Sequence, residues 1–144
     1  MSIRLKLEGF DELLKDIEKA GGSINSATRE CLVKSAVILQ NELVVKMQAA
    51  DVDGDLIKAM DQYEIETHAN RYKARVGYKK GAYDPHNLSA GYKVVFLNYG
   101  TPRRKEHGQI EARGFIQKAK KAANRKIKKQ QEETLQEILK GLES

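Results

Sequence analysis

The acidic turn near the middle of the chain has the pattern closest to a metal-binding loop. Asp51, Asp53 and Asp55 occupy alternate positions, as the first ligands of a calcium-binding EF-hand loop do. Such a loop also requires Gly at its sixth position and Glu at its twelfth. Leu56 and Gln62 occupy those two positions here. We therefore interpret the three carboxylates as a solvated acidic turn and expect no calcium site.

Cys31 and the three histidines are the other residues that could bind a metal or act in catalysis. His68, His86 and His107 fall in separate polar segments, and none has a second ligand at His-x-x-x-His spacing. Cys31 lies beside Leu32 in an apolar helical pattern, whereas a nucleophilic cysteine needs an accessible, electropositive setting and a nearby base. We expect three exposed histidines and a small buried thiol. Since phosphate-binding and nucleophile motifs are also absent from the sequence, we predict no catalytic residue, metal, cofactor or enzyme activity.

A run of cations near the C-terminus is the strongest electrostatic feature. Residues 118–129 include no acid, and three glutamates follow them. The basic face consists of Lys118, Lys120, Lys121, Arg125, Lys126, Lys128 and Lys129. A helix dipole favours the opposite order of charges, so helix stability does not explain the run. It could be a solvated face, contact an acidic neighbouring subunit, or bind DNA phosphates without sequence preference.

The size and composition are those of one ordinary domain over residues 1–144. The chain is 40% hydrophobic and 32% charged, so it can bury a core. Its net charge of +6 suits an acidic partner, either nucleic acid or an acidic protein face. One cysteine cannot form an internal disulfide, and no apolar run approaches the roughly 18 residues of a membrane span. We expect folding in the cytoplasm and no membrane association.

The first part of the chain contains one strand pattern and two helical patterns. Apolar residues at alternate positions of 3–7 predict a short strand with one buried face. Helical spacing over 10–17 predicts a short helix that stops at the glycine pair 21–22. A wider stripe over 23–50 predicts a long helix that is covered on more than one side. Another helical turn is expected over 56–60.

The second part of the chain is predicted to supply the rest of the sheet and a second long helix. Alternation over 63–67 and 72–78 predicts a hairpin, and the apolar stretch 93–99 is predicted as a further strand. The stripe over 113–142 predicts a helix roughly 40 Å long, with one end protruding. The predicted fold class is therefore α+β: a small antiparallel sheet of three to four strands packed against a long helix, with a long C-terminal helix.

Several short motifs have a recognisable order. The chain opens with Ile-Arg-Leu-Lys-Leu-Glu-Gly-Phe-Asp-Glu-Leu-Leu-Lys over 3–15, and Gly-Asp-Leu follows the long helix at 54–56. Farther on come Tyr-Gly-Thr at 99–101 and Ala-Arg-Gly-Phe-Ile at 112–116. In this order and spacing the motifs resemble those of the tail-completion or neck proteins of long-tailed bacteriophages and prophages. The sequence departs from that pattern at Asn98, where an acid is usual, and at position 114, where Gly replaces Pro.

The resemblance implies a structural, non-catalytic subunit at the head–tail interface of a virion, made in the cytoplasm of the bacterial host. It implies a homo-oligomer, expected to be a six- or twelve-fold ring, with connector and tail-tube or terminator proteins as partners. Polar loops over 81–91 and 101–110 are expected to reach neighbouring copies. A cytoplasmic protein that binds DNA non-specifically through the basic face is the alternative hypothesis.

The motifs also suggest residues for the contact between subunits. The candidates are Tyr99, Gly100, Thr101, Arg103, Arg104, Lys105, Arg113 and Phe115. We expect Tyr99 to cover the sheet edge, Gly100 to permit a tight bend, and Thr101 to end the strand. Arg113 and Phe115 would anchor the last helix to the sheet. For Gly100 and Phe115 the alternative is a purely local role in the fold, whereas the basic loop residues are expected to contact a neighbour.

Overall fold

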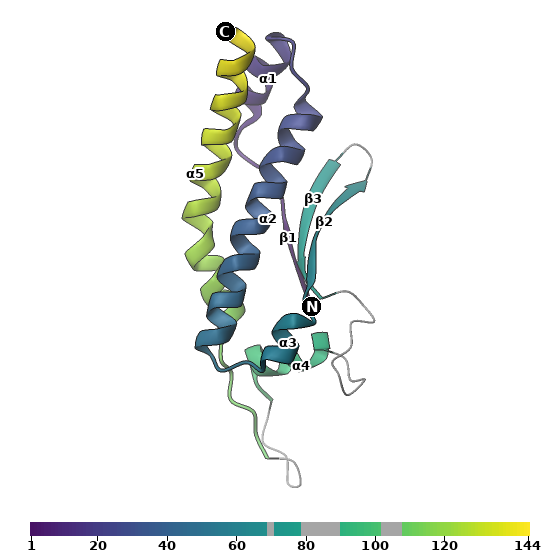
Figure 1. Cartoon of the computed structure of the whole chain (residues 1–144), viewed down its shortest axis with the longest axis vertical. Helices are drawn as coiled ribbons and strands as arrows, with labels where there is room; N and C mark the ends of the chain where they lie inside the picture. Colours follow the sequence, from purple (N-terminus) through teal and green to yellow (C-terminus); the bar gives the residue numbers. More distant parts are fainter. Residues whose placement is uncertain (69–70, 79–89, 102–107) are drawn as a thin grey trace.

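Two long helices run side by side along the long axis of the molecule, and a three-stranded sheet lies on the other side of one of them (Figure 1). This computed structural model describes residues 1–68, 71–78, 90–101 and 108–144. The described elements are β1 (Ser2–Leu5), α1 (Asp11–Lys19), α2 (Ile24–Ala49), α3 (Gly54–Lys58), β2 (Asp61–His68), β3 (Arg71–Gly77), α4 (Ala90–Tyr99) and α5 (Phe115–Glu143). The predicted α+β fold, with its small antiparallel sheet and long C-terminal helix, is confirmed.

Helix α2 lies between the sheet and α5, so it is buried on two sides. Leu32, Leu39 and Leu43 are at most 1% exposed and belong to the main core, which the sheet and α5 complete. The helix begins at a serine cap, where Ser23 Oγ accepts a hydrogen bond from Ser26 N at 3.2 Å. The prediction of a long helix with more than one covered side is therefore confirmed.

The sheet has the strand order β1-β3-β2, and all its pairs are antiparallel. Ile3 pairs with Val76 and Leu5 with Ala74, which places apolar side chains on the face toward α2. The opposite face carries charged side chains, including Arg75, as expected for an antiparallel sheet with one packed face. The predicted hairpin is confirmed, whereas the first strand ends at residue 5 rather than 7.

The prediction of a strand over 93–99 is wrong, because these residues belong to α4. Ala90, Val94 and Asn98 recur every four residues and are buried, which is the spacing of one helical face. The residues between Val94 and Asn98 are also apolar, so the stretch has neither clear alternation nor a clear helical stripe. A short, uniformly apolar run cannot be assigned from periodicity, and here packing decides for a helix.

The C-terminal end of α5 does not protrude alone, contrary to expectation, because α1 and the start of α2 cover it. Ile17, Cys31 and Leu135 are 0% exposed and form, with Ala27, a second apolar cluster separate from the main core. Figure 1 shows α1 beside the last turns of α5. The short first helix therefore has a clear packing role, which is to close this end of the two-helix layer.

Candidate functional site

The two motif segments, which are separated in the sequence, meet where α4 ends and α5 begins. Thr101 N donates to Ile110 O at 2.8 Å, and Ile110 N donates to Thr101 Oγ1 at 3.0 Å. Arg113 N donates to Leu97 O at 3.0 Å. These bonds hold residues 99–101 against residues 110–114, so the structure brings together the candidate residues Tyr99, Gly100, Thr101, Arg113 and Phe115.

Asn98 is the centre of this junction, and it supplies the N-terminal cap that α5 lacks locally. Gly114, at the cap position, has no side chain and adopts φ +61°. Asn98, 1% exposed, accepts hydrogen bonds from Gly114 N through its backbone oxygen at 3.0 Å and from Ile116 N through Oδ1 at 2.8 Å. Proline, whose φ is fixed near about −65°, could not adopt the conformation of Gly114. The two departures from the family pattern therefore lie in direct contact.

Gly100 makes the predicted tight bend, but at the end of a helix rather than of a strand. Its φ is +77°, and its N–H donates to Phe96 O at 2.7 Å. An added Cβ would lie 2.7 Å from Ile110 O and 2.8 Å from Ala112 N, so only glycine fits. Tyr99 does not cover a sheet edge as predicted: it is on α4 and 59% exposed. Thr101 accordingly follows a helix and ends no strand.

Arg113 anchors the start of α5 to α2 rather than to the sheet, which corrects the prediction. Its Nη1 donates to Ala50 O at 2.9 Å and to Asp51 O at 3.2 Å, so it satisfies carbonyls at the C-terminus of α2. Phe115 is 0% exposed within the main core. Both residues thus have local architectural roles, which is the alternative that the sequence had left open for Phe115.

The exposed aromatic face of α4 is the feature that sequence reasoning missed. Tyr92, Phe96 and Tyr99 recur at i, i+4 and i+7 and are 69%, 46% and 59% exposed. The rings of Tyr92 and Phe96 stack with their centroids 6.3 Å apart. We call these three residues the aromatic stripe. Their helical spacing was the available signal, but the predicted strand over 93–99 left out Tyr92 and placed Phe96 and Tyr99 on opposite faces.

Three of the candidate interface residues cannot be placed. Arg103, Arg104 and Lys105 lie outside the described residues, as do most of the two predicted polar loops. His86 and His107 also lie outside them. The predictions for these residues therefore stay predictions.

All seven cations of the basic face are exposed on α5. Lys126 Nζ pairs with Glu42 on α2, and Lys129 Nζ lies 4.0 Å from Glu133. The other five form no ion pair with any residue in the described part of the chain, and they are Lys118, Lys120, Lys121, Arg125 and Lys128. This side of α5 therefore presents positive charges that no described acidic side chain neutralises in an ion pair.

The described residues that were considered for catalysis or metal binding are a buried thiol, a helix cap and an exposed histidine. Cys31 is fully buried; burial, and secondarily Glu30, raises the pKa of its thiol to about 11, so it is not a nucleophile at neutral pH. Asp53 caps α3 by accepting from Asp55 N at 2.8 Å. His68 is exposed at the end of β2. Within the described residues no three His, Cys, Asp or Glu side chains gather closely enough to hold a metal ion.

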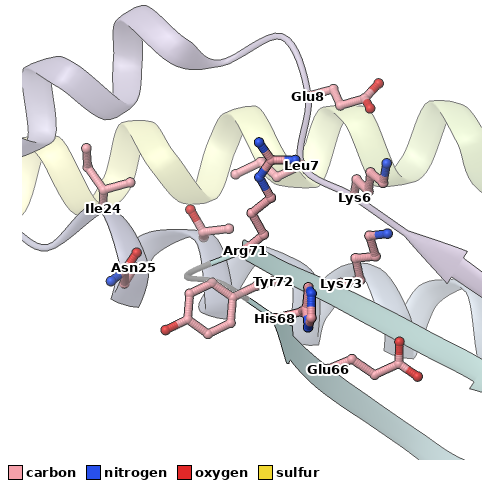
Figure 2. A pocket seen from close by; sticks show the side chains of 11 residues that line it. Lys6, Leu7, Glu8, Ile24, Asn25, Glu66, His68, Arg71, Tyr72 and Lys73 are labelled. Atoms are coloured by element: carbon pink, nitrogen blue, oxygen red, sulfur yellow. The ribbon is translucent and has the colours of Figure 1, made fainter.

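A surface hollow of about 570 Å³ lies between the first turns of α2 and the hairpin end of the sheet (Figure 2). Lys6, Arg71 and Lys73 line it together with Glu8 and Glu66. Three cations therefore stand among two carboxylates around an open space. This mixture of charges favours no ligand of a single sign, and we assign none to the hollow.

Among the described residues no helix is both long and apolar enough to cross a bilayer. Comparisons with models of protein families, with curated proteins and with solved structures each found no match for this chain.

Proposed function

We propose that this chain is a structural subunit of the head–tail connection of a long-tailed phage or prophage, where copies assemble into a ring between neck and tail tube. The observation that carries the proposal is the aromatic stripe, Tyr92, Phe96 and Tyr99, exposed on α4. Tyrosine and phenylalanine are enriched at protein interfaces because they remove large apolar areas from water on binding. The stripe ends at the Tyr99–Thr101 motif, one of the segments that resemble the phage family.

A ring of identical copies needs two unlike surfaces on each copy, because a head-to-tail contact joins different patches. The aromatic stripe would be one of them. Val37 and Val45, 40% and 53% exposed on α2, offer a second apolar surface on a separate element. We expect α4 of one copy to pack against α2 of the next.

The ring is tested by mass photometry of the full chain over a range of concentrations. Phe96→Glu should lower the oligomer population by at least about tenfold, since a charge would then be buried in the contact. Leu142→Glu is the matched control, because Leu142 is an exposed apolar residue in the last turn of α5, and Figure 1 shows this end of α5 at the opposite end of the molecule from α4. The chain should also be found in purified virions. A chain that stays monomeric at every concentration and is absent from virions would contradict the proposal.

Non-specific DNA binding is the second candidate, because five cations of the basic face have no ion pair among the described residues. Binding to random-sequence duplex should then weaken with salt, with a log–log slope of about −0.9 per phosphate contact. Lys118→Glu with Arg125→Glu would remove two such contacts. An absence of binding at low salt would exclude this candidate.

A further inference from the structure

A groove of about 600 Å³ runs between β1 and α5, and it is distinct from the aromatic stripe. One wall is the N-terminal segment from Ser2 to Lys6, and the lining also includes the core residues Leu39 and Ile127, which are 1% and 8% exposed. A volume of this size can hold a small ligand or a short stretch of chain. The groove therefore has an extended backbone along one side and a helix along the other.

The charge of the groove is strongly positive. Five cations line it, with Glu8 as the one acidic side chain among its lining residues. These cations are Arg4, Lys6, Lys120, Lys121 and Lys128. Arg4 pairs with Glu66 at 3.1 Å, whereas the four lysines form no ion pair with any described residue. An acidic occupant would complement them.

The backbone of β1 offers a second, independent feature that an occupant of the groove should match. Tyr78 N donates to Met1 O, and bonded pairs alternate with non-bonded pairs in an antiparallel ladder. Ile3–Val76 and Leu5–Ala74 are therefore the bonded pairs, and the N–H and C=O groups of Ser2 and Arg4 point away from β3. No described strand pairs with this edge of β1. In the part of the chain that the structure describes, it is thus a free edge that can accept another strand.

We propose that the β1–α5 groove binds an extended, acidic peptide segment of a partner protein, which adds to β1 as a fourth strand. The segment's N–H and C=O groups pair with those of Ser2 and Arg4, and its carboxylates face Lys121 and Lys128 across the groove. DNA satisfies fewer of these groups, because its phosphates would oppose the outward carbonyl oxygens of β1. The proposal does not depend on ring assembly.

The test uses a fluorescently labelled short peptide in which Glu alternates with Val, because valine favours extended strands. Fluorescence anisotropy should show binding to the full-length chain. Lys121→Glu with Lys128→Glu should weaken that binding by at least about tenfold. Lys118→Glu with Arg125→Glu is the matched control: it makes the same charge change on α5 at exposed residues that do not line the groove. This control should leave the affinity within about twofold.

Two further probes separate strand addition from simple charge attraction. A peptide of equal charge with two consecutive prolines at its centre cannot complete the ladder and should bind at least about tenfold more weakly. Hydrogen exchange at the amide of Arg4 should slow when the alternating peptide is bound. The proposal is overturned if both double variants lose affinity equally, if the proline peptide binds as well, or if random-sequence duplex binds in the groove and the peptide does not.

Discussion

Gly100 shows how one backbone angle fixes the junction between α4 and α5. Gly100→Ala should lower the free energy of unfolding by about 2 kcal/mol or more, since alanine at φ +77° is strained and its Cβ would contact Ile110 O. Gly141→Ala, in open space on α5, should instead raise it by about 0.5 kcal/mol. Urea denaturation of the two variants checks both signs, and equal effects would contradict this account of Gly100.

Cys31 is expected to be inert in the folded chain at neutral and mildly alkaline pH. Because burial raises its pKa from 9.0 to about 11, the thiolate fraction at pH 8 falls by about a hundredfold. Alkylation by iodoacetamide should therefore be at least that much slower in the folded chain than in urea. Rapid alkylation of the folded chain would show that the thiol is accessible.

The raised pKa of Cys31 also predicts how the stability of the fold changes with pH. The folded state holds the proton of Cys31 more tightly than the unfolded state, so its contribution to stability is complete below pH 9.0 and is lost as the pH rises toward about 11. Thermal unfolding of Cys31→Ala should show a shallower decline over this interval than the parent chain. Parallel declines would mean that other groups cause the alkaline loss.

Helix α5 is capped at its N-terminus by Asn98, a residue of α4, so Asn98 should contribute to the stability of the fold. Asn98→Ala should lower the free energy of unfolding by about 1–2 kcal/mol, because Ile116 N loses its acceptor. Asn98→Asp keeps an oxygen acceptor at the helix N-terminus, where a carboxylate is favourable. It also removes Nδ2, which has no hydrogen-bond partner among the described residues. Aspartate should therefore be more stable than alanine in chemical denaturation, and the reverse order would refute the capping role.

The described part of the chain has two apolar clusters along its length, and they should not be equally stable. The cluster around Ile17 and Leu135 is small and depends on the short helix α1. Ile17→Ala should remove about 2–5 kcal/mol locally and let this end open before the rest. Hydrogen exchange should then quicken over residues 11–19 and 131–143, while β3 and the second half of α2 stay protected. Uniform acceleration across the chain would indicate one cooperative unit instead.

Periodicity alone was sufficient to predict the strands with one buried face and the helices with a long apolar stripe. Alternation gave the β2–β3 hairpin, and the stripes over 23–50 and 113–142 gave both long helices, because such patterns match only one backbone period. The apolar run over 93–99 shows neither period clearly, so only the packing of Val94 and Asn98 in the interior made it a helix. The exposure of the aromatic stripe follows from that choice. The sequence also could not predict that Asn98 caps α5 or that β1 lies across a groove from the lysines of α5. Both arrangements join residues that are far apart in the chain, and they are fixed only when the elements pack.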